Sequence, residues 1–326
     1  MLRTKIVSTG SYLPERILSN SELEKMVDTS DQWITERTGI KERRIASNDQ
    51  AVSDLAFEAS KLALERAQIS AKDIELIIVA TITGDMPVPS SGCILQDKLG
   101  AVNAAAFDIN AACSGFIYGL SIANAYIKSG VYKRILLVGA EVLSKFTNWK
   151  DRNTCVLFGD GAGAVILEAT DGDQGIYSVD IYSDGSFANL LNLPGGGSKN
   201  PPSPESLKNE LHYLQMKGNE TFKVAVKTLE QLVISTIEKN NIKSSDIKLL
   251  IPHQANLRII SATASRLGMD MSRVMVNLNK CGNTSAASIP IALDEAVTSG
   301  RIEKNDYILL EAFGGGLTWA SALIKW

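Results

Sequence analysis

Hydrophobic and polar positions along the chain follow two periods, which together predict an α/β protein. Continuous apolar runs rich in β-branched residues occupy 74–80, 132–141 and 249–251, and such runs are typical of strands buried on both faces. Between them, apolar positions recur at helical spacing, as over 51–67 and 116–129. Alternating strands and helices of this kind predict layers of helices around central sheets.

The second half of the chain repeats the pattern of the first. The repeated segments are 70–78 with 243–251, 107–115 with 276–283, and 132–141 with 306–311. Each segment of the first two pairs is interpreted as a strand or the entry to one, and 276–283 is predicted to be a strand before a helix of small residues. Matching order and spacing at three points indicate an internal duplication.

We therefore predict two α/β halves, residues 1–171 and 172–326, that meet along a pseudo-twofold axis. The segment 183–215 is rich in Gly, Pro, Ser and Asn, so we expect a long surface excursion there that marks the junction between the halves. A site at the seam would draw residues from both halves.

Composition and charge exclude several classes of function. The net charge of −3 over 326 residues gives no basic footprint for nucleic acid, and no apolar run is long enough to cross a bilayer. The N-terminus lacks the apolar core of a signal peptide. The four cysteines form no CxxC pair and fit no zinc site. We expect a cytoplasmic protein with reduced thiols, no metal and no cofactor.

Cys113 lies where a short run, predicted to be a buried strand, gives way to a helix of small residues. The unpaired N–H groups at a helix start favour the thiolate, so we expect the thiol pKa to fall below its reference near 8.5. Buried cysteines are more often small hydrophobic residues. The segment alone favours a nucleophile and a packing residue about equally.

Polar residues follow strands of the second half at positions equivalent to the Cys113 loop. His253 follows a buried strand, Asn283 precedes a helix, and Gly314–Gly316 interrupts a strand. Separately these residues are typical of a core histidine, a helix cap and a bulge. Their equivalent places in duplicated halves favour Cys–His–Asn chemistry.

Two further segments stay open to more than one interpretation. Trp33 and Arg37 are spaced to clamp an adenine ring by stacking, but the charged stretch that follows them is of a kind that is usually solvated surface, and the sequence alone does not choose. The glycines of 159–163 lack the lysine of a phosphate-binding loop, so close backbone packing is the better interpretation.

Five segments carry a resemblance to the β-ketoacyl-acyl-carrier-protein synthase III family of the thiolase fold. They are 110–116, 151–163, 252–256, 282–287 and 311–319, and the likeness runs from the N-terminus to Trp326. The resemblance implies two duplicated α/β halves in an αβαβα arrangement and a homodimer. It also implies a condensing enzyme that initiates fatty-acid synthesis, in which an acyl-CoA primer acylates Cys113 and the decarboxylated malonyl group of malonyl-acyl-carrier protein attacks the acyl group.

The family's roles fit the chemistry of the matching residues. Cys113 is the nucleophile, and neutral His253 and Asn283 donate hydrogen bonds to the malonyl thioester oxygen as enolate charge develops. The N–H groups of Cys113 and Gly315 form the oxyanion hole, and Phe313 supplies a dry wall beside the sulfur. With Cys113 as the nucleophile, we expect the other cysteines, Cys93, Cys155 and Cys281, to be packing residues.

Substrate and carrier contacts also follow from the resemblance. The adenine of CoA is expected between Trp33 and Arg152, with Arg37 near the phosphates. The pantetheine tunnel is implied at Asn219, Phe222, Ala255 and Asn256, and the acyl-carrier-protein contacts at Gln254 and Arg258.

Other functions fit the sequence less well. A chain-elongating condensing enzyme needs two active-site histidines, and His212 lies in the polar excursion. A biosynthetic thiolase needs a second cysteine near the C-terminal glycines, and a papain-like hydrolase lacks the duplication. A related synthase of secondary metabolism with the same triad remains the enzyme alternative. A non-catalytic acyl-CoA-binding or carrier-binding scaffold is disfavoured by the intact triad.

Val88 gives a prediction about the primer. Many family members have phenylalanine in this turn, which reaches the acyl pocket of the neighbouring subunit. Because valine is smaller, we predict that the pocket admits primers longer or more branched than acetyl. Comparing kcat/KM for acetyl-, isobutyryl- and octanoyl-CoA tests this, and a strong preference for acetyl-CoA would contradict it.

Overall fold

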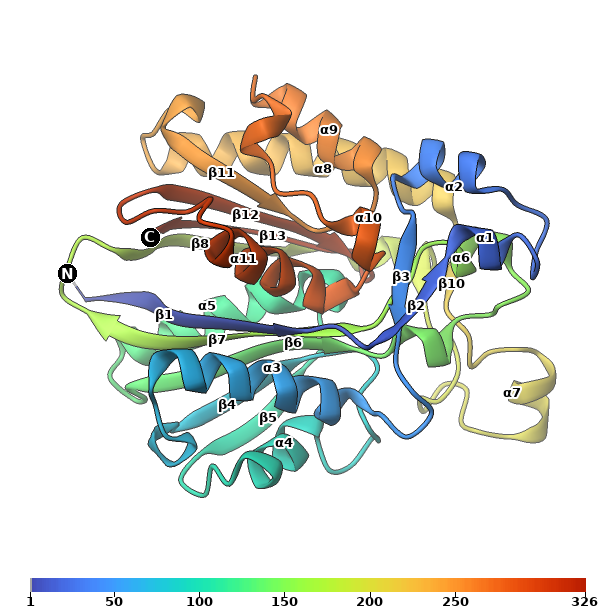
Figure 1. Cartoon of the computed structure of the whole chain (residues 1–326), viewed down its shortest axis with the longest axis horizontal. Coiled ribbons are helices and arrows are strands. Elements are labelled where there is room, and N and C mark those ends of the chain that lie inside the picture. Colours follow the sequence, from blue (N-terminus) through green and yellow to red (C-terminus); the bar gives the residue numbers. More distant parts are fainter. Residues whose placement is uncertain (1) are drawn as a thin grey trace.

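The computed structural model describes residues 2–326 and has five layers of alternating helices and sheets (Figure 1). Helices α3 (Val52–Ala67) and α4 (Ser91–Leu99) cover the outer face of one sheet, and α8 (Gly218–Lys239) and α9 (Leu257–Arg266) cover the outer face of the other. Helices α5 (Gly115–Lys128) and α11 (Ser288–Thr298) lie between the sheets. This is the αβαβα arrangement expected from the sequence.

The first sheet has the strand order β1-β7-β6-β4-β5. Its strands are β1 (Arg3–Tyr12), β7 (Gly161–Thr170), β6 (Arg134–Glu141), β4 (Leu76–Ala80) and β5 (Ala105–Ile109). The first two pairings are antiparallel and the last two are parallel. The parallel strands β4 and β6 are buried almost throughout, as their continuous apolar runs predict.

The second sheet repeats this arrangement, with the order β8-β13-β12-β11. Its strands are β8 (Gly175–Ser183), β13 (Thr318–Lys325), β12 (Tyr307–Gly314) and β11 (Ile247–Pro252). The pairings are again antiparallel, antiparallel and parallel. The strands β8, β13, β12 and β11 thus match β1, β7, β6 and β4 in order and direction, and the internal repeat predicted from the sequence is present in the fold.

The core between the sheets is built by α5 (Gly115–Lys128) and α11 (Ser288–Thr298), which are apolar on more than one face. Phe116 and Leu120 of α5 and Ile289 and Leu293 of α11 are fully or almost fully buried against both sheets. These two helices hold the ends of their preceding loops at the centre of the molecule.

The remaining elements are short and decorate the two layers. The strands are β2 (Arg16–Ser19), β3 (Glu42–Ile45), β9 (Leu191–Asn192) and β10 (Gln215–Met216), and the helices are α1 (Asn20–Leu23), α2 (Asp31–Thr38), α6 (Arg152–Cys155), α7 (Pro204–Lys208) and α10 (Leu278–Cys281). Two 3₁₀ turns matter for the site, η2 (Ala112–Ser114) and η7 (Ser285–Ala287). Within residues 2–326, no helix has both the length and the apolar character needed to span a membrane.

Three expectations about elements need correction. The segment 276–283 is not a strand, because it holds the short helix α10, and only Val274 bridges to β11. Strand β5 is at the edge of its sheet and is partly exposed instead of buried. The excursion 183–215 does not separate the sheets, because β8 precedes it and pairs with β13. The predicted halves 1–171 and 172–326 stay a prediction of domain organisation.

The seam between the layers depends on glycine. A β-carbon on Gly139 of β6 would lie 2.2 Å from the carbonyl oxygen of Ala286 in η7. Backbone therefore packs against backbone at this point, and no side chain fits between β6 and η7.

The Gly139→Ala substitution is expected to lower the free energy of unfolding by at least about 1–3 kcal/mol, because the carbonyl of Ala286 belongs to a packed turn and cannot move freely. Urea unfolding followed by circular dichroism measures the change. Gly185→Ala is the matched control, since a β-carbon there meets no atom within 4 Å, and it should change stability by less than about 0.5 kcal/mol. Equal stability of the two variants would contradict the close approach.

Candidate active site

Cys113 lies in η2, one residue before the N-cap of α5, at the level where the two sheets approach each other. Ala112 before it has a φ of 45°, and the sulfur-bearing residue is only 5% exposed. The backbone of β12 packs directly against it, because a β-carbon on Gly314 would lie 2.6 Å from the Cys113 nitrogen. The second half therefore holds the nucleophile loop of the first in place.

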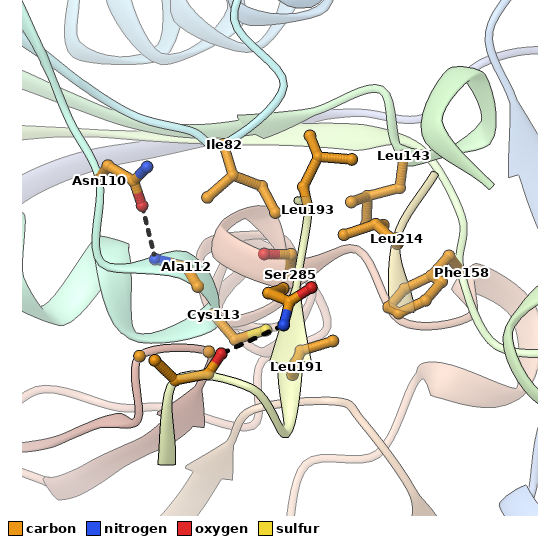
Figure 2. Close-up of a pocket in the computed structure, with 14 residues that line it drawn as sticks. Ile82, Asn110, Ala112, Cys113, Leu143, Phe158, Leu191, Leu193, Leu214 and Ser285 are labelled. Atoms are coloured by element: carbon orange, nitrogen blue, oxygen red, sulfur yellow. Dashed lines mark hydrogen bonds between the residues drawn. The ribbon is translucent and has the colours of Figure 1, made fainter. Parts of the chain in front are cut away.

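A cavity of about 340 Å³ opens at Cys113 (Figure 2). Figure 2 shows Cys113 and Ser285 among the lining residues, with Asn110 on one side and Leu143 and Phe158 on the other. Most of the lining is apolar, from Ile82, Leu143, Phe158, Leu191, Leu193 and Leu214. We refer to this space as the Cys113 cavity.

The thiol of Cys113 is not pre-ionised, which corrects the expectation of a lowered pKa. Burial raises the pKa of Cys113 to about 11 and outweighs all other influences. The Ser285 hydroxyl and the N–H groups of Cys113 and Gly315 lower this pKa, whereas the charge of Glu141 raises it. Cys113 is therefore a thiol at neutral pH.

His253 follows β11 and is buried, with its backbone N–H donating to the Glu311 carbonyl oxygen at 2.8 Å. Burial lowers the pKa of its imidazole to about 3, so the ring is neutral at neutral pH. Nδ1 lies 2.6 Å from the Ser288 hydroxyl oxygen, which also accepts a hydrogen bond from the Gln254 N–H. This arrangement favours a Ser288 proton directed at Nδ1 and leaves the ring proton on Nε2.

Asn283 is held by backbone contacts with the first half of the chain. Its N–H donates to the Leu157 carbonyl oxygen at 2.8 Å, and its own carbonyl accepts from the Gly159 N–H at 3.0 Å. Its side-chain oxygen accepts from the Ser285 N–H at 2.9 Å. With that oxygen occupied, the amide NH₂ is the group left to donate to a ligand.

The strand β12 and the turn after it supply the remaining site residues. Phe313 is 6% exposed and packs in an apolar cluster with Leu190 and Leu317. Gly315 lines the Cys113 cavity, and its N–H lies close enough to the sulfur to stabilise negative charge there. Among the three triad residues, only Cys113 lines this cavity, whereas His253 and Asn283 do not.

At the predicted adenine site, the two arginine side chains lie over the Trp33 ring, where adenine is expected to stack. The Arg152 guanidinium lies 4.8 Å from the centre of the Trp33 ring, and that of Arg37 lies 5.9 Å from it. Arg152 also donates to the Asp28 carbonyl oxygen at 2.9 Å. A cavity of about 360 Å³ adjoins Arg152 and Asp28.

The α8 and α9 residues predicted to contact substrate are close together at the helix starts. Arg258 lies over the Phe222 ring at 5.0 Å, and Asn219 is exposed at the start of α8. Asn256 caps α9 and donates from its side chain to the Arg37 carbonyl oxygen at 3.0 Å. Ala255 next to it is partly exposed.

The expectation that Gln254 contacts a carrier protein is wrong. Gln254 is 1% exposed, and its amide group donates to the carbonyls of Pro252 and Met275. Its side-chain oxygen accepts from the N–H groups of Asn277 and Leu278. Gln254 therefore joins β11 to the segment before α10 and presents no side chain to a partner.

Val88 and the other cysteines lie away from the Cys113 cavity. Val88 is 83% exposed, so within one chain it forms no wall of the site. Cys155 and Cys281 are buried, as expected for packing residues, but Cys93 is exposed on α4, which corrects the packing role expected for it.

Three polar residues near the site were missed by the sequence analysis. Ser285 lies inside the matching segment 282–287 but was given no role, and Ser288 and Glu141 lie outside all five segments. One signal was available for the two serines, because both lie within eight residues of Cys281 in the segment that begins the second-half helix. Glu141 ends a buried apolar strand, where an acidic residue is unusual.

Comparison with known proteins places this geometry in a family. Models of "3-Oxoacyl-[acyl-carrier-protein (ACP)] synthase III" match residues 107–185, and models of its C-terminal part match 237–326. The chain is 56% identical to the beta-ketoacyl-[acyl-carrier-protein] synthase III of Caldanaerobacter subterraneus subsp. tengcongensis, over 98% of this chain and 97% of the relative. It is 53% identical to that of Xanthomonas campestris pv. campestris, over 99% and 98%.

A solved structure shows the same fold. The crystal structure of 3-oxoacyl-[acyl-carrier-protein] synthase III from Aquifex aeolicus VF5 superposes with a TM-score of 0.93 and 48% sequence identity. The match covers 99% of this chain and 100% of the other.

The state of His253 can be read directly by ¹⁵N NMR of the two histidine side chains. Because burial lowers its pKa to about 3, His253 is expected to stay neutral from pH 8 to pH 5, with its proton on Nε2. In Ser288→Ala the fixed tautomer should give way to a mixture. A His253 titration midpoint near 6.5 would contradict this account.

Proposed function

The chain belongs to the 3-oxoacyl-[acyl-carrier-protein] synthase III family, and from this premise we propose how its own residues carry out the condensation. The reaction joins an acyl-CoA primer to malonyl-acyl-carrier protein and yields 3-oxoacyl-acyl-carrier protein, CO₂ and CoA. It is an acyl transfer that initiates fatty-acid synthesis. The observation that carries the proposal is the packing of the Cys113 loop against Gly314 of the second half. Asn283 is held in turn by backbone contacts with the first half, and His253 follows the strand next to β12.

In the first step the sulfur of Cys113 attacks the thioester carbonyl of the primer. The N–H groups of Cys113 and Gly315 lie near the sulfur, where they can donate hydrogen bonds to the developing oxyanion. Each such donor contributes about a hundredfold or more to the rate in enzymes of acyl transfer. The carbon–sulfur bond to CoA breaks, and the acyl group stays on Cys113.

In the second step the malonyl thioester oxygen accepts hydrogen bonds from Nε2 of His253 and from the Asn283 amide. Both donors are fixed from behind, by Ser288 and by the Ser285 N–H. A neutral imidazole suits this role because it donates without forming an ion pair with the malonyl carboxylate. Loss of CO₂ leaves a carbanion that attacks the acyl-Cys113 carbonyl, and the wall of Phe313 excludes water.

The Cys113 cavity supports a primer larger than acetyl. Its volume of about 340 Å³ and its aliphatic lining suit a branched or medium-length acyl chain. Val88, exposed on one chain, would border this cavity from the other subunit of a homodimer. The homodimer is therefore part of the proposal.

The wider setting follows the same premise. CoA would lie along Trp33, Arg152 and Arg37, with its pantetheine arm passing the starts of α8 and α9 at Asn219, Phe222, Ala255 and Asn256. Exposed Arg258 would meet the acidic carrier protein through a salt-sensitive contact. We further propose a cytoplasmic enzyme that needs no metal or cofactor, because the substrates' own thioester bonds and the loss of CO₂ drive the condensation.

Substitutions in the triad separate the two partial reactions. Cys113→Ser should abolish acyl transfer from acyl-CoA, measured as acyl-enzyme by mass spectrometry. His253→Ala and Asn283→Ala should leave acylation largely intact and slow malonyl decarboxylation by about a hundredfold or more, measured as CO₂ release.

Matched controls are available in the chain itself. Cys93→Ser on α4 and His212→Ala in the excursion remove the same side chains away from the site and should retain both reactions. If both partial reactions fell equally in the His253 and Asn283 variants, the assigned division of roles would be wrong. Absence of acyl-Cys113 in the unsubstituted protein would refute the acyl-enzyme.

A further inference from the structure

A buried carboxyl group without an assigned role lies beside the Cys113 loop. Glu141 ends β6 and is fully buried. Its carboxylate accepts hydrogen bonds from the Thr81 hydroxyl at 3.1 Å, the Thr83 hydroxyl at 2.5 Å and the Ile82 N–H at 3.2 Å. No ion pair in the part of the chain described by the structure includes it. A buried acid without a cation is costly to ionise, so its retention calls for an explanation.

The hydroxyl of Ser285 lies between this carboxyl group and the nucleophile. Ser285 directly precedes Ala286, whose carbonyl packs on Gly139 two residues before Glu141, and its hydroxyl depresses the pKa of Glu141 and the pKa of Cys113 alike. Its oxygen is buried and, within residues 2–326, forms no hydrogen bond of ordinary geometry, either to these two groups or to any other. Ser285 also lines the Cys113 cavity next to the sulfur (Figure 2). A hydroxyl is both donor and acceptor, so it can pass a proton from one neighbour to the other.

The acidities of the two end groups suit proton transfer. Burial raises the pKa of Glu141 to about 7 and that of Cys113 to about 11. Near neutral pH the carboxyl group is partly ionised and the sulfur carries its proton, which must leave as the sulfur attacks. A base with a pKa near the working pH is the most effective acceptor. The transfer also neutralises Glu141, whose charge otherwise opposes the thiolate.

Other titratable groups around Glu141 are already engaged. The Asp160 carboxylate, beside the residue that pairs with Glu141, accepts from Ala46 and Ser144. Lys145 donates to the carbonyls of Asn48 and Gln50. His253 has a pKa near 3 and holds Ser288. At the far ends of β6 and β7, Arg134 and Glu168 pair with each other.

We propose that Ser285 and Glu141 form a proton relay that serves Cys113. As the sulfur bonds to the primer carbonyl carbon, the thiol proton passes to the Ser285 oxygen and the Ser285 proton passes to the Glu141 carboxylate. The bond between the acyl carbon and CoA breaks, its electron pair leaves with CoA as the thiolate, and solvent protonates that thiolate. The proton stays on Glu141 in the acyl-enzyme and returns through Ser285 when condensation releases the Cys113 thiolate.

Ser285 touches the reacting sulfur in this scheme, whereas Glu141 is a positioning residue that acts through it. The relay rests on the proposed acylation of Cys113. Two variants test it, Glu141→Gln, which keeps the size but cannot take a proton, and Ser285→Ala, which removes the hydroxyl. Ser285 has a φ of 47°, and Ala112 adopts the same conformation at 45°, so alanine is tolerated there. Glu311→Gln is the matched control, because Glu311 is a second buried carboxyl group with a raised pKa.

The first measurement is the single-turnover rate of CoA release from acyl-CoA as a function of pH. In the unsubstituted enzyme the rate should rise through pH 7 as Glu141 ionises. Glu141→Gln and Ser285→Ala should lose this rise and be slower by about a hundredfold at pH 8, with the KM for acyl-CoA unchanged. Glu311→Gln should keep the rise. An unchanged or faster Glu141→Gln variant would overturn the relay, as would an equal loss in Glu311→Gln.

The second measurement does not need the substrate and so separates failure of the relay from failure of the proposed function. Alkylation of Cys113 by iodoacetamide, followed by mass spectrometry of its peptide, reports the reactivity of the sulfur directly. The rate should rise in two steps, near pH 7 and near pH 11, and both variants should lose the lower step. A single step near pH 11 in the unsubstituted protein would overturn the relay even if acyl-CoA proved not to be the substrate.

Discussion

Direct contact of backbone with backbone at the seam between the two halves is the constraint on which the site depends. Gly139 of β6 packs on the carbonyl of Ala286, and Gly314 of β12 packs on the nitrogen of Cys113. Each sheet thereby fixes the loop of the opposite half with no flexible side chain between them. The oxyanion donors, the sulfur and the asparagine share one rigid frame, and such preorganisation is what makes fixed dipoles effective in a dry site.

The duplication supplies one framework twice, and the two copies have diverged in chemistry. Asn110 and Asn283 occupy matching places, and each side-chain oxygen accepts the N–H two residues later, that of Ala112 or of Ser285. The same sequence spacing relates Cys113 to Ala286, so only one copy carries a nucleophile. This spacing also relates Glu141 of the first half to Gly314 of the second. The position that carries an acid in one half therefore carries a glycine in the other, where a side chain would collide with Cys113.

The fold and the triad were readable from sequence because both depend on local pattern. Buried parallel strands such as β4 and β6 are continuous apolar runs. The segments around Cys113, His253 and Asn283 are short motifs of characteristic sequence. Burial was not readable. A helix start predicts an acidic thiol at Cys113, but desolvation dominates once both halves close over it. Gln254 stands in the same motif as His253, yet its side chain turns inward to Asn277 and Leu278. Ser285 and Glu141 come near each other only through the tertiary fold, which no spacing along the chain reveals.

The stacking of Arg152 on Trp33 gives the proposed adenine site an internal competitor. An adenine ring that enters there must lift the guanidinium from the indole and also release it from the Asp28 carbonyl. Stacking of adenine on Trp33 therefore replaces stacking of Arg152 on the same ring. Only the difference between the two interaction free energies contributes to the affinity for adenine. Under the proposed function, this exchange weakens the hold on released CoA, so CoA would leave more readily before the carrier-bound substrate enters.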